Sequence, residues 1–355
     1  MSKKVAILTG GGDCPGLNAV IRAAVYRGIK EYGFEIVGLL EGWRGLLEKK
    51  TRKLEIKDVA DIVSEGGTIL GTSRTNPVKS KESLEKAVEN FKELGLDCII
   101  VIGGDDTNTA GYELSKQGLN IVGVPKTIDN DLSATDVTFG FDTAINIAMD
   151  SIDRIRTTAR SHNRVFVIEL MGRHAGWITL EAGVAGAADI ILLPEEPFSM
   201  DDLIDKLREI RDNGKNYAIV AVSEGARLSV SANDSSSLFF KDLEKDEFGH
   251  VRLGGIAGKL SEEIQDELDW ESRSVVLGHT QRGGAPSAFD RFLSTRFGSS
   301  AMAEVARENY GVVVCLQGAD IVPVKLGPKV LDQKLIPEKY LQYASLFGAR
   351  LGKIK

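Results

Sequence analysis

The chain has 355 residues, of which 43% are hydrophobic and 27% are charged, with a formal net charge of −7 at pH 7. This length exceeds what one hydrophobic core usually supports, so we expect a globular protein of two lobes. The negative net charge argues against a chain that wraps nucleic acid or lies on an anionic membrane, and no apolar run reaches the roughly 18 residues of a membrane span.

The opening residues lead from two lysines straight into an apolar strand, without the pattern of a signal sequence, so we expect a cytoplasmic location. The three cysteines, Cys14, Cys98 and Cys315, lack metal-ligand spacing. Two of them lie in or beside apolar strands, and we therefore predict reduced thiols packed in the interior.

Strands and helices alternate along the first part of the chain. Residues 4–9 read as a buried strand, which ends in the turn GGGDCPG and precedes an amphipathic helix over Leu17–Lys30. The turn matches neither GxGxxG nor a P-loop, and tight packing of a strand on a helix would also require glycine. After a strand over Glu35–Leu40, the turn GGTILGTSRTNP places Arg74 among small hydrogen-bonding side chains, as in many phosphate sites. A helix is predicted over Ser83–Leu94.

The next stretch, Cys98 to Asp131, contains two apolar runs, CIIVI and NIVGV, that each stop at a polar or glycine-containing turn. This pattern is typical of buried parallel strands. After the first run, Gly103 and Gly104 allow close approach of the backbone. Thr107 is predicted to cap the following helix, which leaves N–H groups directed at an anion.

Four polar side chains follow the second run: Lys126, Thr127, Asp129 and Asp131. Parallel strands present their carboxyl ends at one edge of a sheet, so these groups are expected to lie near the helix N-terminus. Carboxylates, a lysine and a helix N-terminus together predict a site for magnesium and phosphate.

The strand–helix rhythm continues through the second half. Strands are predicted at Val165–Leu170, Ile190–Leu193, Tyr217–Val222, Ser274–Leu277 and Val312–Leu316. Helices are predicted over 139–161, Met200–Asp212, Ile256–Leu268 and 289–309. Residues 225–253 are polar and serine-rich and read as a surface excursion. We predict an α/β fold of two doubly wound lobes with mostly parallel sheets.

Further polar side chains follow three of these strands: Arg173 and His174 in MGRH, Glu224 in SEG, and His279 and Arg282 in GHTQR. Each alone has a structural explanation, because histidines often complete turns and glutamates often cap helices. Their recurrence at strand ends favours a binding site, since open α/β sheets bind ligands there.

The ordered motifs LTGGGDCPGLNAVIR, GTSR, GGDDT, PKTIDND, MGRHAGW, SEG and LGHTQRGG resemble the phosphofructokinase family from Val5 to about Val314. The resemblance implies a phosphofructokinase-like fold. Its larger, donor-binding lobe would comprise residues 1–140 plus about 281–330, and its smaller, fructose 6-phosphate-binding lobe residues 141–280 plus about 331–355. It also implies phosphoryl transfer to the 1-hydroxyl of fructose 6-phosphate, with Mg²⁺ and either ATP or pyrophosphate as donor.

The same resemblance implies roles for individual residues. Asp129 resembles the base that accepts the hydroxyl proton, with Thr127 and Asp131 beside it in the catalytic group. Arg173 resembles the cation that stabilises the transferred phosphoryl group, and Asp105 resembles the carboxylate that anchors magnesium. These residue types suit phosphoryl transfer, which depends on alignment and on stabilising spread negative charge.

The remaining implied contacts fall into two groups. The donor-binding group is Gly11, Arg74, Gly104, Asp106, Thr107 and Lys126. The substrate-binding group is Thr127, Asp129, Arg164, Met171, Gly172, Arg173, Glu224, Arg273, His279 and Arg282. In the family, Arg164 and Arg273 reach the substrate of a neighbouring subunit, which implies a homodimer or homotetramer with shared sites.

Asp106 and Lys126 bear on the choice of donor. ATP-dependent members of the family generally have glycine at the first position, and many also have glycine at the second. An aspartate facing the α-phosphate of a nucleotide at about 4 Å would repel it by ~4 kcal/mol at an effective dielectric of 20. Lysine supplies a compact charge for a phosphate. The pair favours pyrophosphate, although Asp106 as a simple helix cap is the structural alternative.

The first helix departs from the allosteric bacterial members, which have arginines one turn apart. Here Tyr26 follows Arg22 by one turn, and Arg27 is rotated by about 100° around the helix. We therefore expect little response to ADP or phosphoenolpyruvate.

Three alternatives remain open. The enzyme could use ATP, or both donors. It could be a catalytically silent sugar-phosphate sensor, although Asp105, Asp129 and Arg173 are all present. A lipid or nicotinamide-nucleotide kinase shares a GGD turn, but not its combination with TIDND, MGR and GHTQRGG.

Overall fold

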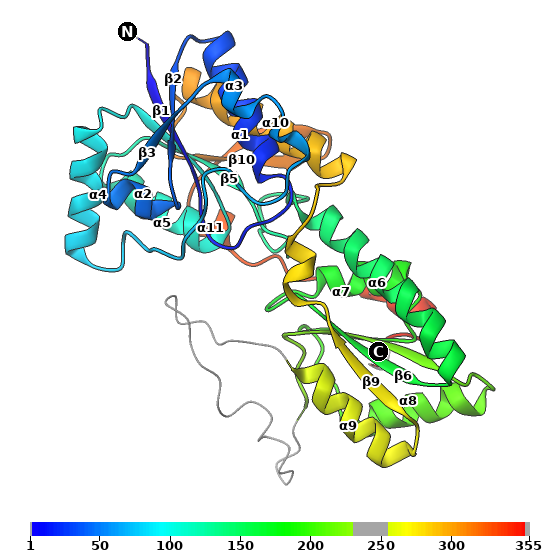
Figure 1. The fold of residues 1–355 in the computed structure, drawn as a ribbon. Coiled ribbons are helices and arrows are strands. Elements are labelled where there is room, and N and C mark those ends of the chain that lie inside the picture. Colours follow the sequence, from blue (N-terminus) through cyan, green and yellow to red (C-terminus); the bar gives the residue numbers. More distant parts are fainter. Residues whose placement is uncertain (1, 230–254, 352–355) are drawn as a thin grey trace. The chain divides into compact units, whose positions relative to one another are not determined.

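The computed structural model describes residues 2–229 and 255–351. The chain divides into two units, each built on its own sheet (Figure 1). Unit 1 comprises Met1–Thr143 and Arg282–Gln333, and unit 2 comprises Ala144–Gln281 and Lys334–Lys355. Most of the predicted surface excursion, residues 230–253, lies outside the described residues.

Unit 1 contains a seven-stranded sheet in the order β11-β10-β5-β4-β1-β2-β3. Its strands are β1 (Lys4–Thr9), β2 (Glu35–Leu39), β3 (Thr51–Leu54), β4 (Cys98–Gly103), β5 (Ile121–Pro125), β10 (Val312–Gln317) and β11 (Asp320–Lys325). The five inner strands are parallel, and β3 and β11 pair antiparallel at the edges. Every residue of β4 is buried, as expected for an apolar strand covered on both faces.

Helices cover both faces of this sheet. They are α1 (Leu17–Lys30), α2 (Trp43–Leu47), α3 (Ile56–Val59), α4 (Lys81–Glu93), α5 (Asp105–Lys116), α10 (Ala288–Ala306) and α11 (Pro328–Leu331), with a 3₁₀ turn at Ile62–Ser64. α2, α4 and α5 share one core through Leu46, Phe91 and Leu114. On the other face α1 packs on α10, where a Cβ at Gly298 would lie 2.2 Å from the Val20 carbonyl oxygen, so only glycine fits.

Unit 2 contains a four-stranded parallel sheet in the order β7-β8-β6-β9. Its strands are β6 (Val165–Leu170), β7 (Ile190–Leu192), β8 (Ala218–Ser223) and β9 (Ser272–Val276). Its helices are most of α6 (Phe141–His162), α7 (Trp177–Ala185), α8 (Met200–Asp212), α9 (Ile256–Leu268) and α12 (Glu338–Leu346), with a 3₁₀ turn at Gly278–Arg282. α8 and α9 form a core with one face of the sheet.

The predicted α/β class with two doubly wound, mostly parallel sheets is confirmed. One local prediction is wrong: Thr107 does not cap a helix, because α5 begins at Asp105 with Gly104 as its N-cap. The prediction of packed thiols is confirmed, since all three cysteines are buried and unpaired with one another.

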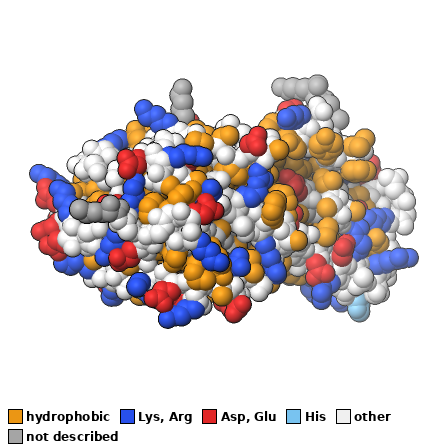
Figure 2. Space-filling model, turned by 90° about the horizontal axis from the view of Figure 1, so that it is seen from above, with side chains coloured by type: hydrophobic (Ala, Val, Ile, Leu, Met, Phe, Trp, Pro, Cys, Tyr) orange, Lys and Arg blue, Asp and Glu red, His pale blue; other side chains and the backbone are white. Residues whose placement is uncertain are grey.

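Two further observations concern the surface of the described residues. None of their helices is long and apolar enough to cross a bilayer. Figure 2 shows one face, on which basic and acidic side chains are interspersed with apolar ones. That face carries no single-sign patch of the kind that binds nucleic acid through its phosphates.

Candidate active site

In unit 1, the turns that carry the predicted donor-binding residues other than Arg74 follow three adjacent strands, β1, β4 and β5. From β1 the chain proceeds to β2 on one side, whereas β4 pairs with β1 on the other. The carboxyl end of β1 is thus a topological switch point, where open α/β sheets leave room for a ligand.

Lys126 joins these three turns. Its side chain is only 4% exposed, and its ammonium donates a hydrogen bond to the carbonyl oxygen of Gly12 in the glycine turn. Its backbone N–H donates to Gly103 at the end of β4, at 2.9 Å. Burial lowers the pKa of Lys126, and the nearby guanidinium of Arg282 lowers it further, while carboxylates including Asp129 act in the opposite direction.

Thr107 fills the space between two of the turns. A Cβ at Gly10 would lie 2.6 Å from Thr107 Cγ2, and one at Gly103 would lie 2.3 Å from Thr107 Cβ. Both positions therefore require glycine, because the buried Thr107 cannot move away. Asn108 supports the same corner by donating from Nδ2 to the Gly104 oxygen at 3.0 Å.

The first turn of α5 carries two carboxylates. Asp105 is exposed and Asp106 is half-buried, and the backbone N–H of Asp106 donates to Asp105 Oδ1 at 2.8 Å. Neither residue occupies the N-cap position, which belongs to Gly104. The carboxylates are stabilised by the positive end of the helix dipole.

The turn after β5 brings a second group of carboxylates. Thr127 Oγ1 accepts a hydrogen bond from the Asp129 N–H at 3.0 Å, which orders the turn. Burial raises the pKa of Asp131 to about 7, and repulsion from Asp129 and then Asp105 contributes to the rise. The three carboxylates thus concentrate negative charge where β4 and β5 end.

This acidic region fits a magnesium ion that is held mainly by donor phosphates. Among residues 2–229 and 255–351, no three His, Cys, Asp or Glu side chains lie close enough together to form a metal cage. Mg²⁺ commonly takes one or two carboxylates and completes its shell with water and substrate phosphate oxygens. A site based on Asp105 agrees with that preference.

Arginines flank the glycine turn. Thr72 Oγ1 donates to the Gly11 oxygen at 2.5 Å, and this bond fastens the loop of the exposed Arg74 to the turn. Arg282 donates from Nη1 to the Asp13 oxygen at 3.3 Å. The structure therefore places Arg282 with the predicted donor-binding group of unit 1, although the sequence grouped it with His279.

In unit 2, the predicted substrate contacts follow three adjacent strands, β8, β6 and β9. The Gly172 oxygen accepts hydrogen bonds from Ser223 Oγ at 2.6 Å and from the Gly225 N–H at 3.1 Å. The Met171 N–H donates to Gln281 Oε1 at 3.3 Å. These bonds bring together the turns that carry Met171, Gly172, Arg173, Glu224 and His279.

Arg164 and Arg273 do not belong to that cluster. Arg164 precedes β6, and Arg273 is the second residue of β9, so both lie near the amino ends of their strands. β6 has six residues, which at about 3.3 Å per residue separates its two ends by about 20 Å. The two arginines are therefore remote from Arg173 within unit 2.

Sequence reasoning missed several residues that hold these turns. Gly12 accepts the Lys126 bond, and a Cβ there would lie 2.3 Å from Arg282 Nη1. Gln281 links the turns after β6 and β9. Both lie inside recognised motifs, but only the strand order shows what they contact.

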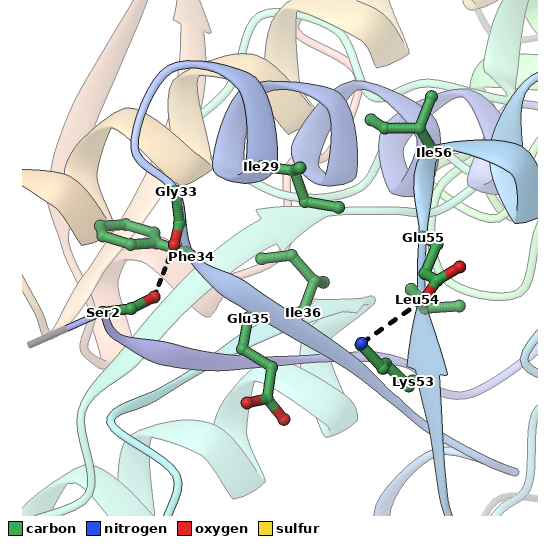
Figure 3. A pocket seen from close by; sticks show the side chains of 10 residues that line it. All are labelled: Ser2, Ile29, Gly33, Phe34, Glu35, Ile36, Lys53, Leu54, Glu55 and Ile56. Atoms are coloured by element: carbon green, nitrogen blue, oxygen red, sulfur yellow. Dashed lines mark hydrogen bonds and ion pairs between the residues drawn. The ribbon is translucent and has the colours of Figure 1, made fainter.

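Two features lie apart from these turns. A cavity of about 460 Å³ opens beside Ile29, Glu35 and Ile36, at the amino end of β2 (Figure 3). The figure shows mostly apolar side chains and an ion pair between Lys53 and Glu55, with 3.4 Å between Nζ and Oε1. The cavity therefore lies at the amino ends of the parallel strands, whereas the switch point lies at their carboxyl ends.

The two arginines of α1, Arg22 and Arg27, form contacts with other residues of unit 1. Arg22 donates from Nε to the Ala60 oxygen at 3.1 Å and stacks over Tyr26, 4.7 Å from the ring centre. Arg27 bonds Glu31 at 2.9 Å and Ser299 Oγ at 2.9 Å. Both guanidiniums are thus bound by other residues of unit 1.

Comparison with known proteins places this architecture. Residues 4–305 match the family model described as phosphofructokinase. A pyrophosphate–fructose 6-phosphate 1-phosphotransferase of Amycolatopsis methanolica is 51% identical over 97% of this chain and 100% of its own. An ATP-dependent 6-phosphofructokinase of Streptomyces coelicolor is 48% identical over 94% of this chain and 97% of its own.

Solved structures agree with this result. The Pichia pastoris phosphofructokinase in the T-state has a TM-score of 0.80 and 32% identity, and the match covers 98% of this chain and 36% of that longer one. A pyrophosphate-dependent phosphofructokinase of Marinobacter aquaeolei has a TM-score of 0.81 at 22% identity, over 95% and 86% of the two chains, and shows the shared fold. The chain belongs to the phosphofructokinase family.

Proposed function

We propose that this protein transfers a phosphoryl group from pyrophosphate to the 1-hydroxyl of fructose 6-phosphate, giving fructose 1,6-bisphosphate and phosphate. The choice of donor rests on two residues: the buried Lys126, whose ammonium bonds the glycine turn, and Asp106, whose carboxylate lies in the first turn of α5. Relatives named for either donor are about equally similar, so overall identity does not decide between them.

The proposed reaction needs a base, a cation and an anchor for the metal. Asp129 accepts the proton of the sugar 1-hydroxyl as the hydroxyl oxygen attacks the phosphorus of the donor. The Thr127 hydroxyl accepts a hydrogen bond from the Asp129 backbone N–H and so orders that residue. Arg173 stabilises the charge on the transferred group. Asp105 would hold Mg²⁺, which would supply positive charge to neutralise the phosphate oxygens of the donor.

Two structural details support pyrophosphate. The N-cap of α5 is Gly104, so a helix-capping role does not account for Asp106. Its carboxylate would instead repel the α-phosphate of a nucleotide, a group that pyrophosphate lacks. Lys126 offers the opposite charge, and its buried ammonium already faces the glycine turn.

The two units divide the substrates in this proposal. Unit 1, with the switch point of its sheet, binds the donor, and the turns of unit 2 bind fructose 6-phosphate. The family resemblance implies that Arg164 and Arg273 serve the substrate of a second copy, and their position at the other end of the unit 2 sheet from Arg173 supports this role. The protein is thus a homodimer or homotetramer in the cytoplasm, with shared sites.

Pyrophosphate transfer lies closer to equilibrium than ATP transfer, so the reaction runs in both directions, in glycolysis and gluconeogenesis. Phosphate and fructose 1,6-bisphosphate should return measurable pyrophosphate. The absence of any reverse flux would count against pyrophosphate as the natural donor.

The decisive experiment compares donors on the wild type and on Asp106→Gly. We expect the wild type to turn over faster with pyrophosphate than with ATP, and the variant to gain ATP turnover. Thr109→Gly, at an exposed position of the same helix, controls for the cost of a helical glycine. Faster wild-type turnover with ATP would reject the proposed donor.

The same assay separates the other two candidates. The ATP-dependent enzyme is favoured by the 48% identical relative that carries that name. A silent sugar-phosphate sensor would bind fructose 6-phosphate and show no turnover with either donor.

A further inference from the structure

Glu271 in unit 2 is bonded to both arginines that lie at the amino ends of the strands. Its Oε1 atom lies 2.8 Å from Arg164 Nη2 and 2.6 Å from Arg273 Nη2. One carboxylate oxygen is therefore shared by two guanidinium groups, which it holds against each other's repulsion. The side chains remain partly exposed, at 42% for Glu271, 26% for Arg164 and 50% for Arg273.

Strand pairing fixes the carboxylate between the two cations. Val165, the first residue of β6, pairs with Ser272, the first residue of β9. The Val165 N–H donates a hydrogen bond to the backbone carbonyl oxygen of Glu271 at 3.0 Å. The residues just before Val165 and on either side of Ser272 are therefore neighbours. Arg273 also donates from Nη1 to the Ser272 oxygen at 2.8 Å, which further restrains its side chain.

The charges around Glu271 are mostly positive. The pKa of Glu271 is lowered chiefly by the hydrogen bond from Arg164, and the charges of Arg273 and His162 lower it further. Without the carboxylate, long arginine side chains of like charge would separate and sample many rotamers in solvent. Binding a phosphate between them would then require both to be ordered again.

We propose that Glu271 is a positioning residue that holds Arg164 and Arg273 together, ready to receive the phosphate group of fructose 6-phosphate bound to a second copy of the chain. This rests on the proposed function, in which the two arginines contact that substrate. Glu271 itself does not touch the sugar phosphate. Its carboxylate sets the spacing of the guanidinium pair.

The test is the steady-state kinetics of Glu271→Gln, which keeps the side-chain size and removes the charge. We expect the KM for fructose 6-phosphate to rise on the order of tenfold, the cost of ordering the arginine pair again. The kcat and the KM for the donor should stay within about twofold, because the reacting atoms are untouched. The control is Glu209→Gln, which removes the charge from another ion pair of unit 2, with 2.9 Å between Glu209 Oε2 and Lys206 Nζ. This variant should change none of these kinetic values.

Two outcomes would overturn the proposal. An unchanged KM would mean that the arginines find their positions without Glu271, and a lowered KM would mean that the carboxylate competes with the substrate phosphate. If Glu271→Gln does not fold, Glu271→Asp carries the test. It keeps the charge on a shorter side chain, so a smaller rise in KM of about threefold is expected, and no rise refutes the proposal.

A binding measurement separates this proposal from the proposed function. Thermal unfolding with increasing fructose 6-phosphate and no donor reports binding alone. Glu271→Gln should need about ten times more fructose 6-phosphate than the wild type for the same rise in Tm, whichever donor the enzyme uses. Failure of turnover with pyrophosphate would reject the donor, and an equal dose response would reject the role of Glu271.

Discussion

Replacing Asp290 by alanine should destabilise unit 1 strongly. Asp290 lies in α10 and is fully buried. Its Oδ1 accepts from the Gly140 N–H at 2.9 Å, and its Oδ2 accepts from the Thr143 N–H at 2.8 Å and from Thr143 Oγ1 at 2.5 Å. One carboxylate thus satisfies donors at the start of α6, ten residues beyond the turn that carries Asp131.

Alanine would leave these three donors without their acceptor. Each buried unsatisfied donor costs roughly 1–3 kcal/mol. Part of that cost is offset, because burial raises the pKa of Asp290 and shows that the charged carboxyl is itself expensive to bury. Taking the lower end for each donor, we expect a loss of about 3 kcal/mol in the free energy of unfolding, or about 6–12 °C in Tm for a unit of this size.

The assay is thermal unfolding followed by circular dichroism, with urea unfolding for the free energy. Asp290→Asn retains one acceptor oxygen and should lose less than Asp290→Ala. Asp61→Ala, at an exposed position in the same unit, should stay within about 0.5 kcal/mol of the wild type. The reasoning fails if Asp290→Ala unfolds within about 2 °C of the Asp61 variant.

Three other changes test separate features. Gly12→Ala would place a Cβ 2.3 Å from the movable Arg282 Nη1, so the KM for the donor should rise about tenfold with little change in Tm, and an unchanged KM for the donor would contradict the proposed contact. Asp131 has its pKa raised from 3.8 to about 7, so the folded state binds more protons than the unfolded state between these values. Stability in chelator should therefore fall as pH rises from about 4 to about 7, by up to about 4 kcal/mol, and urea unfolding of Asp131→Asn should show no such fall. Glu169 accepts 3.0 Å hydrogen bonds from two backbone N–H groups at the start of α9. Glu169→Gln should therefore lower the free energy of unfolding, measured in urea, by about 1–2 kcal/mol. A decrease below about 0.5 kcal/mol would show that this cap is dispensable.

The sequence predicted the elements best where local chemistry is unambiguous. The bounds of β6, α8 and α9 match the predicted ranges, because polar or glycine residues flank each apolar pattern within two positions. The edge strands β3 and β11 were not predicted. β3 is polar and mostly exposed, so it lacks the apolar run that identifies a buried strand, and in the partly exposed β11 a proline, Pro323, interrupts the apolar residues.

What sequence reasoning missed at the site depends on contacts between distant segments. Thr107 was assigned to a cap from its side-chain type, but its packing depends on Gly10, which is nearly a hundred positions away. The contact of Arg282 with the glycine turn was not foreseen, because the chain passes from unit 2 to unit 1 between Gln281 and Arg282. Glu271 was overlooked because its role depends on the pairing of β6 with β9.

If Arg164 serves the site of a second copy, as proposed, its position about 20 Å along β6 from Arg173 has a genetic consequence. A subunit with Asp129→Ala still has an intact Arg164, and a subunit with Arg164→Ala still has an intact Asp129. When the two inactive forms are coexpressed, each mixed dimer contains one site in which both defects coincide and one site in which neither occurs. Random pairing would then restore about a quarter of wild-type activity from two forms that are each impaired alone.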